Sequence, residues 1–226
     1  MARPSGSDYH GPYRYPGRVD VLPAIADERR RTADLIEHLA PAQLDTPSLC
    51  GDWTVVQVAG HLLAAIDKSA TPLLGLIVSS GFNIHKANSR LAVRMAERPA
   101  AELAQGLRDN AENPFRPPIV GHLGQLTDLQ VHGQDMRRPL GLPHGLRLER
   151  LRLSLNFLVG GRAIGFTPKR RVAGLRFEAT DLDWVWGEGP VVGGPAEALM
   201  LAMTGRKVAL AELDGPGVAI LRNRLP

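Results

Sequence analysis

Cysteine is nearly absent from this 226-residue chain, in which Cys50 is the only one. A single cysteine excludes an internal disulfide and any zinc cluster built from several thiolates. This cysteine usage is typical of a reducing compartment, and the first residues lack the apolar run of a signal peptide. We therefore expect a cytoplasmic protein.

Lysine and aromatic residues are also scarce. Lysine occurs only at positions 68, 86, 169 and 207, and aromatic residues make up 5% of the chain. The formal net charge of +4 therefore reflects arginines that are scattered in short runs. Stacking platforms and groove-reading helices need a basic stripe interleaved with aromatics, so we expect no nucleic-acid partner.

Long apolar runs are missing as well. The longest, around residues 72–82, is interrupted by Gly75 and two serines and is too short to cross a bilayer. With 44% hydrophobic and 22% charged residues, the composition is that of a globular protein with one large or two modest domains. We expect no membrane partner, and a monomer or a homodimer.

Helical periodicity dominates the first two thirds of the chain. Residues 1–18 are rich in Gly, Pro, Tyr and Arg and predict an extended arm. Apolar spacing and helix-breaking prolines then predict helices joined by short loops, over residues 19–39, from 54 to at least 71, and over 84–97, 100–110, 121–138 and 146–159. This arrangement predicts a helical bundle over 19–160.

The pattern changes after about residue 160. Alternation over residues 172–180 predicts a strand, and residues 184–186 and 191–192 predict two more. Gly194-Pro195 precedes a helix expected over 196–203, and Gly205 ends it. The sequence thus predicts the α+β class, with a helical bundle followed by a small α+β domain over 161–226.

Asp128, His132 and Asp135 form the first candidate site. A helix advances about 100° per residue, so these side chains lie within roughly 60° of one another on one face. A carboxylate and an imidazole one turn apart can share a divalent cation, and a polar group beside them can orient the imidazole. Asp135 is then that acceptor, a further ligand, or an ordinary surface acid.

A single helix cannot close a metal site, and His61 is the best candidate for a further ligand. It lies in a segment that is apolar on nearly all sides, which is typical of a buried helix. A lone buried histidine is more often part of the core, but the second helix with its own Asp–His pair favours a metal. His122 competes with His61, although it lies some 80° around the helix from His132.

The residues just before the His61 helix receive structural interpretations. Cys50 is interpreted as a small apolar filler of a loop, because no basic residue flanks it closely. Trp53 is interpreted as a packing residue of the core.

Several blocks of the sequence together resemble the mycothiol-dependent maleylpyruvate isomerase family, from Arg18 to the C-terminus. They are, in order, residues 49–55 (LCGDWTV), Gly60-His61-Leu62, residues 132–141 (HGQDMRRPLG), Ala179-Thr180-Asp181 with Trp184 and Gly187, and residues 194–206. The resemblance implies a DinB-like four-helix bundle that binds a divalent metal, usually zinc, followed by a small α+β domain.

The resemblance also implies site residues. The metal triad of the family maps onto His61, Asp128 and His132, where the prototype has glutamate in place of Asp128. An aspartate is one methylene shorter, so the metal must lie closer to that backbone or be bound more loosely. An active-site arginine maps onto Arg206, whose planar fork would hold a substrate carboxylate in two places. Mycothiol, a sugar-linked cysteine derivative, is the implied co-substrate.

The metal triad, the arginine and the thiol co-substrate together predict an enzyme that activates a thiol at a metal ion. Three protein ligands keep the fourth position of a tetrahedral ion open, and a thiol entering there is deprotonated. The thiolate can add to an electron-poor alkene and leave after bond rotation, which is isomerisation, or displace a leaving group, which is S-transfer. Both remain open, as does a non-catalytic DinB-like metal-binding module with a regulatory or stress role.

Overall fold

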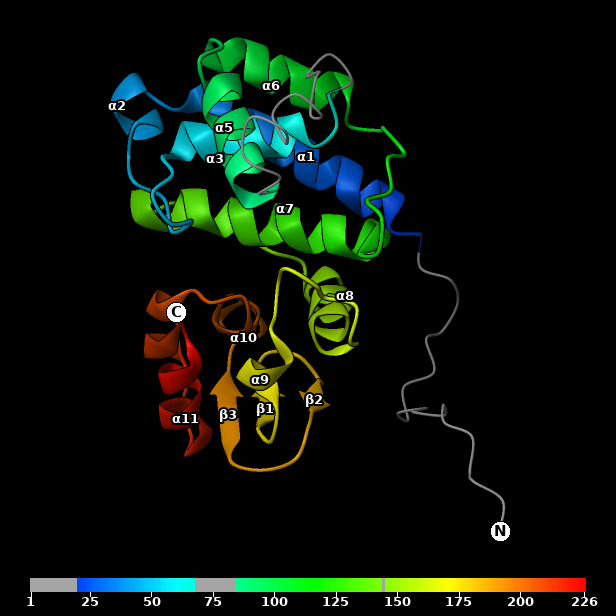
Figure 1. Cartoon of the computed structure of the whole chain (residues 1–226), viewed down its shortest axis with the longest axis vertical. Helices are drawn as coiled ribbons and strands as arrows, with labels where there is room; N and C mark the ends of the chain where they lie inside the picture. Colours follow the sequence, from blue (N-terminus) through cyan, green and yellow to red (C-terminus); the bar gives the residue numbers. More distant parts are fainter. Residues whose placement is uncertain (1–19, 68–83, 144) are drawn as a thin grey trace.

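The computed structural model describes residues 20–67, 84–143 and 145–226, which form two lobes on either side of one long helix, α7 (Figure 1). The helices that precede α7 make up the first lobe, and α8 and the later elements make up the second. This arrangement confirms the predicted α+β class, with a helical bundle followed by a small α+β unit. The arm expected at 1–18 lies outside the described residues.

In the helical bundle, α1 packs on α6 and α7, and α3 packs on α5, α6 and α7. Its elements are α1 (Leu22–His38), α2 (Pro41–Leu44), α3 (Val55–Ala64), α5 (Ile84–Ala96), α6 (Ala100–Asp109) and α7 (Gly121–Arg137). The predicted bounds agree within a few residues except at two places. The expected loop over 41–52 contains α2, and α3 ends before the predicted residue 71, with residues 68–83 outside the described ranges.

The start of α3 is defined by its first residues. Thr54 is the N-cap, and its backbone N–H donates a hydrogen bond of 3.0 Å to the side-chain oxygen of Gln57, as in a capping box. Val58, Leu62 and Leu63 are buried in the bundle core, so α3 is the buried helix that its apolar sequence predicts. His61 is therefore held on a helix whose position is fixed by core packing.

Gly60 lets α3 approach α5 closely, next to His61. A Cβ atom at Gly60 would lie 2.6 Å from the carbonyl oxygen of Ala92 and 3.1 Å from the backbone nitrogen of Ala96. We expect Gly60→Ala to lower the free energy of unfolding by about 1–3 kcal/mol, because the backbone of α5 must move. Denaturant titration measures this change. Gly106→Ala is the control and should cost less, since its Cβ would meet only the flexible end of Leu63.

Helix α7 is shared by the cores of both lobes. Leu126 and Met136 belong to the bundle core, whereas Val131 belongs to the core of the second lobe. Every residue from 124 to 137 is buried except Asp128. Polar side chains buried on such a helix need partners, and these come from both lobes.

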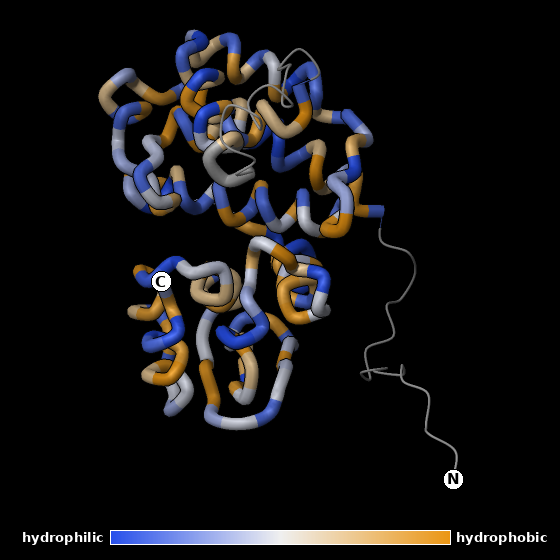
Figure 2. Tube along the Cα trace, viewed as in Figure 1, coloured by the Kyte–Doolittle hydropathy of each residue, from blue (hydrophilic) through white to orange (hydrophobic). Residues whose placement is uncertain are grey.

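The second lobe contains a three-stranded sheet of order β2-β1-β3, in which β1 pairs antiparallel with β2 and parallel with β3. Its elements are α8 (Leu148–Val159), α9 (Lys169–Val172), β1 (Arg176–Ala179), β2 (Val185–Trp186), β3 (Val191–Gly194), α10 (Ala196–Met203), the 3₁₀ helix η2 (Lys207–Glu212) and α11 (Gly217–Arg224). In helix α11, hydrophobic residues at 218–221 are followed by hydrophilic residues at 222–224 (Figure 2).

The strand expected over 172–180 is wrong in its first part, because Val172 ends the short helix α9 and β1 begins only at Arg176. Gly174, with φ of +67°, turns the chain between the two elements. Leu175 and Phe177 are buried on either side of Arg176, so the alternation is real there but does not extend back to Val172.

Helix α8 precedes the expected boundary at residue 160, yet its Leu151, Leu155 and Leu158 are part of the second lobe's core. The division into a bundle at 19–160 and a domain at 161–226 stays a prediction. Within the described ranges, no helix is both long enough and apolar enough to span a membrane.

Helix α10 carries the chain from the sheet to α7. At its start, the backbone N–H of Ala196 donates a 2.8 Å hydrogen bond to Asp181. After its end, Gly205 has a φ of +102°, and the chain turns so that Arg206 faces α7. Arg138 adds a second link between the lobes through ion pairs with Glu197 and Glu212.

Candidate metal centre

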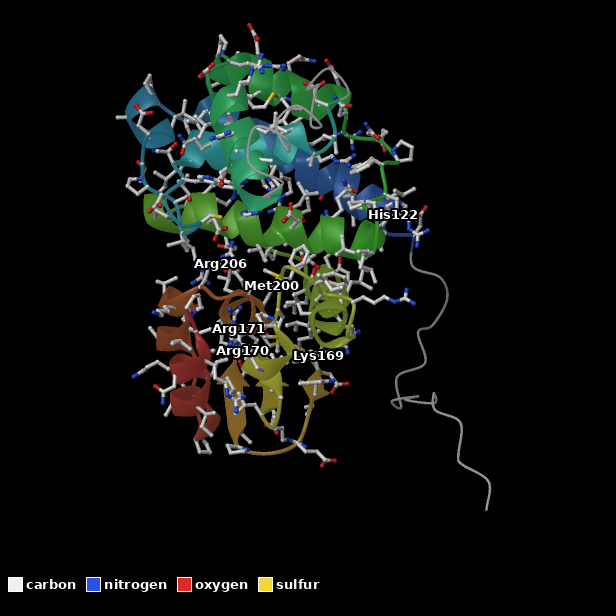
Figure 3. The ribbon with its side chains drawn as sticks, viewed as in Figure 1. His122, Lys169, Arg170, Arg171, Met200 and Arg206 are labelled. Atoms are coloured by element: carbon white, nitrogen blue, oxygen red, sulfur yellow. The ribbon has the colours of Figure 1, made fainter. Side chains whose placement is uncertain are left out.

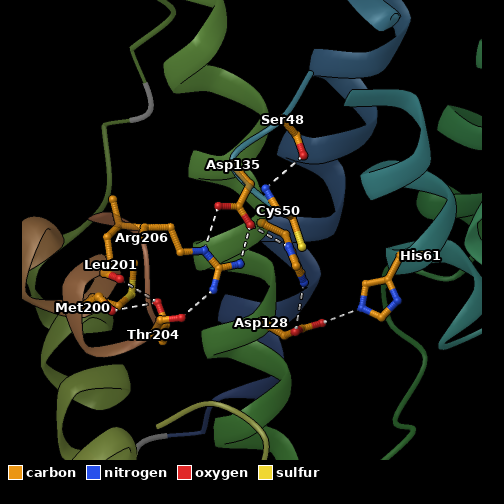
Figure 4. Close-up of polar contacts among 10 residues, drawn as sticks. Ser48, Cys50, His61, Asp128, Asp135, Met200, Leu201, Thr204 and Arg206 are labelled. Atoms are coloured by element: carbon orange, nitrogen blue, oxygen red, sulfur yellow. Dashed lines mark hydrogen bonds and ion pairs between the residues drawn. The ribbon is translucent and has the colours of Figure 1, made fainter. Parts of the chain in front are cut away.

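His61, Asp128 and His132 meet between α3 and α7 (Figure 4). His61 Nε2 lies 3.6 Å from one oxygen of Asp128, and His132 Nε2 lies 3.4 Å from the other. The ligand atoms of all three residues lie within 4.8 Å of one another. The structure therefore brings together the three residues that the sequence predicts as a metal triad.

The spacing of these atoms fits a metal ion better than direct hydrogen bonds. Ligands about 2.1 Å from a tetrahedral zinc ion lie about 3.4 Å apart, whereas an N–H···O hydrogen bond is about 2.9 Å long. The two contacts of Asp128, at 3.4 and 3.6 Å and each to a different carboxylate oxygen, are longer than such a hydrogen bond. Two imidazoles and a carboxylate are also a donor set that zinc accepts. The residues present thus fit a divalent cation.

Asp135 fixes the orientation of the His132 ring. The Nδ1 of His132 donates a 2.8 Å hydrogen bond to Asp135, whose side chain has no solvent exposure. Nδ1 is therefore protonated, which leaves Nε2 directed at Asp128. This is the pairing that orients metal-binding histidines in proteins.

Arg206 in turn holds Asp135 from the second lobe. Its Nε and Nη2 donate to the two carboxylate oxygens at 2.9 and 2.6 Å, and its Nη1 donates to the carbonyl of Thr204 at 2.9 Å. A chain of contacts thus runs from Arg206 through Asp135 and His132 to Asp128 (Figure 4). The sequence predicts Arg206 near the site, but it gives no sign of this pairing.

A guanidinium carries five N–H groups. Three of those of Arg206 are used within the chain, which leaves one on each terminal nitrogen. The Arg206 side chain is 15% exposed.

The pKa values of Asp128 and His132 are set mainly by the opposite charges around them. Burial opposes ionisation of Asp128, but His132 and His61 outweigh it and hold the pKa of Asp128 below its ordinary value. Burial likewise disfavours charged His132, yet Asp128 and Asp135 raise its pKa well above the usual range. A nitrogen that binds a metal must not carry a proton. A cation bound at His132 Nε2 would therefore displace the proton from that nitrogen.

Burial and opposite charge also compete in setting the pKa values of Asp135 and Arg206. Burial raises the pKa of Asp135, but its hydrogen bonds to His132 and Arg206 outweigh burial and lower the pKa. Burial disfavours the charged form of Arg206, yet Asp135 raises the pKa of this guanidinium. Both groups are therefore charged, and Asp135 stays an acceptor for His132.

Cys50 and Trp53 pack against the bundle core, as their sequence interpretation predicts, and they also line the candidate metal centre. The Cys50 thiol joins His132 and Asp135 in a second cluster whose ligand atoms lie within 4.8 Å. The Trp53 ring centroid lies 5.1 Å from that of His61 and 6.4 Å from that of His132. Their loop is tied to α7 because Leu49 donates its N–H to the Asp135 carbonyl at 3.1 Å. This tertiary contact helps to hold the loop at the site.

His122 does not take part in the centre. It lies at the far end of α7, ten residues before His132, which is about 15 Å along a helix (Figure 3). Its Nε2 lies 3.3 Å from the carbonyl oxygen of Pro114. Of the two histidines that the sequence offers as partners for His132, the structure brings only His61 to it.

The fold and the centre define a class of protein: a helical bundle with a candidate His–Asp–His metal centre, covered by a small α+β unit. Residues 25–113 match the family model described as the mycothiol maleylpyruvate isomerase N-terminal domain. No curated protein matches the chain.

Two solved structures share the fold. A histidine-to-alanine variant of the mycothiol-dependent maleylpyruvate isomerase aligns with a TM-score of 0.54 and 13% identity, over 86% of this chain and 91% of that chain. A structure of the mycothiol-dependent maleylpyruvate isomerase aligns with a TM-score of 0.52 and 12% identity, over the same shares. At these identities the likeness is one of fold.

The match of residues 25–113 and the shared fold agree with the resemblance to the mycothiol-dependent maleylpyruvate isomerase family predicted from the sequence. The matched range contains His61 but ends before α7. The roles of Asp128 and His132 therefore rest on their geometry in this chain.

Proposed function

We propose that this protein is a metal-dependent enzyme that uses mycothiol as a thiol co-substrate and acts on a small, electrophilic, carboxylated substrate. The reaction is an isomerisation or an S-transfer, and we place it in the cytoplasm. The observation that carries the proposal is the cluster of His61, Asp128 and His132, whose ligand atoms lie within 4.8 Å of one another. The proposed metal is zinc, which this donor set suits.

Each residue of the centre has a separate task in this proposal. His61, Asp128 and His132 hold the cation, which when bound supplies a Lewis acid that favours the thiolate form of an entering thiol. Asp135 keeps His132 in the tautomer that presents Nε2. Trp53 covers the two imidazoles on one side and limits the access of water to them.

Arg206 has two tasks in the proposal. Its Nε and Nη2 hold Asp135, and through it the ring of His132. The remaining N–H groups, one on each terminal nitrogen, can donate hydrogen bonds to the two oxygens of a substrate carboxylate. This supports the carboxylated substrate and explains why the second lobe is needed beside a bundle that already offers the metal ligands.

The test is incubation of the zinc-loaded protein with mycothiol and a panel of electrophiles, analysed by chromatography and mass spectrometry. S-transfer adds the mass of mycothiol to the substrate, whereas isomerisation gives a product of unchanged mass and altered retention. Thiol-dependent conversion of a carboxylated electrophile supports the proposal. A protein that binds one zinc ion per chain and converts none of them is instead a non-catalytic metal-binding module.

The assignment of Asp128 makes its own prediction. Asp128→Asn keeps the shape of the side chain but removes its negative charge, so zinc affinity should fall by about a hundredfold or more while the fold is retained. Competition with a chromogenic chelator measures the dissociation constant. Asp135→Asn, which removes the charge that orients His132 and pairs with Arg206 but leaves the three proposed ligands in place, should cost roughly ten- to a hundred-fold. If Asp128→Asn binds zinc as tightly as the wild type, Asp135 becomes the better candidate.

A further inference from the structure

A cavity of about 1050 Å³ lies in the second lobe, apart from the candidate metal centre. It is bounded by the end of α8, the 160–168 loop, α9 and Trp186 of β2. None of the three proposed metal ligands lines it. Ligand pockets are typically about 300–1000 Å³, so the cavity is large enough for a small molecule.

The walls of this cavity are largely apolar. Val159, Phe166, Val172 and Trp186 contribute to them. The Phe166 ring packs edge-on against Phe157, with ring centroids 5.4 Å apart, which fixes one wall. Such a surface suits an aliphatic or aromatic body.

The charged residues that line the cavity are all basic. Lys169 and Arg171, from α9, are the charged side chains among its described lining residues, and none of those residues is acidic. Figure 3 shows both residues on α9, in the second lobe. The cavity is therefore an electropositive space with apolar walls.

Among the residues that the structure describes, no carboxylate forms an ion pair with the buried cation Arg171. The residue is 8% exposed, its Nη1 donates a 2.8 Å hydrogen bond to the carbonyl of Met203, and its Nε has no hydrogen-bond acceptor. Burial, together with the positive charges of Arg206 and Arg170, lowers the pKa of Arg171. Because an uncompensated buried charge is costly, this guanidinium favours an anion beside it.

We propose that this cavity binds a small amphipathic carboxylate, with its apolar body against Phe166, Val172 and Trp186 and its carboxylate at Arg171. Lys169, which is exposed, adds a second positive charge at the cavity. A neutral apolar ligand would contact the same apolar walls but would leave the positive charge of Arg171 without a partner.

This site is independent of the proposed thiol chemistry, although the two share one residue. Thr204 lines the cavity, and its carbonyl accepts a hydrogen bond from Arg206. Arg171 itself bonds to the Met203 carbonyl and to none of the three proposed metal ligands, so removing its charge should leave zinc content unchanged. Failure of one proposal can then be distinguished from failure of the other.

The experiment is calorimetric titration of the full-length protein with decanoate, below its micelle concentration, and with decanol as the uncharged analogue. We expect the wild type to prefer decanoate, and Arg171→Gln to weaken decanoate binding by about ten- to a hundred-fold with little change for decanol. The control is Arg170→Gln, which removes a neighbouring exposed arginine that does not line the cavity and should bind like the wild type.

Lys169→Glu is a second variant. Because residue 169 is exposed, this substitution does not change a buried side chain, as Arg171→Gln does. It reverses one charge at the cavity and should also weaken decanoate binding without affecting decanol. The proposal is overturned if the wild type binds no decanoate, if it binds decanoate no better than decanol, or if both charge variants bind decanoate like the wild type.

Discussion

Replacing His132 with alanine is expected to abolish stoichiometric zinc binding and thiol-dependent turnover. The substitution removes the ligand atom that faces Asp128 at 3.4 Å and leaves only two of three protein ligands. The helical fold should survive, because the bundle core is made of apolar residues on α1, α3, α6 and α7 rather than of the metal centre. Zinc per chain, measured by mass spectrometry, and far-ultraviolet circular dichroism check the two halves of this prediction.

His61→Ala should have the same effect on zinc, since His61 supplies the ligand from the other helix. His122→Ala is the matched control, because it removes a histidine from the opposite end of the same helix α7. It should bind one zinc ion per chain, like the wild type. Retention of full zinc by both His61→Ala and His132→Ala would show that the metal is bound elsewhere.

Arg206→Lys is expected to lower kcat/KM on a carboxylated electrophile by about thirty- to a hundred-fold, equivalent to about 2–3 kcal/mol. Arginine can hold both oxygens of Asp135 and still present two N–H groups, whereas lysine has a single nitrogen at the end of its side chain. Zinc content should be unchanged, because Arg206 is not a ligand. Steady-state kinetics of the zinc-loaded variant measure the loss.

Two comparisons separate the tasks of Arg206. The loss should be smaller on the methyl ester of the same electrophile, since the ester has no carboxylate to bind. Arg138→Lys is the control for general loosening between the lobes, because Arg138 also joins them through ion pairs but does not contact the metal centre. If Arg206→Lys keeps the wild-type kcat/KM, or if Arg138→Lys loses as much, Arg206 does not bind substrate.

Cys50 shows that the neighbours of a residue in the sequence do not reveal its neighbours in the folded protein. Its immediate neighbours in the chain carry no positive charge, and they support its interpretation as an apolar filler. In the structure its thiol lies beside His132 and Asp135, which come from more than 80 positions later in the chain. No pattern of spacing within residues 48–53 reports that neighbourhood.

The sequence by itself determined most of the secondary structure and one face of the centre. Capping at Thr54 and apolar spacing place His61 on a buried helix, and the fixed rotation per residue aligns Asp128, His132 and Asp135. Such features are local, because they depend on residues within a few turns of one another. The early start predicted for the strand at 172–180 was wrong because Gly174 turns the chain after the short helix α9.

Only the tertiary structure decided which side chains meet. The packing of α3 against α7 brings His61 to Asp128, and the turn at Gly205 brings Arg206 to Asp135. It also decided that Asp135 binds a histidine and an arginine rather than facing solvent. These contacts join residues that are 67 and 71 positions apart, and they arise from the burial of apolar faces that carry no information about the polar residues beside them.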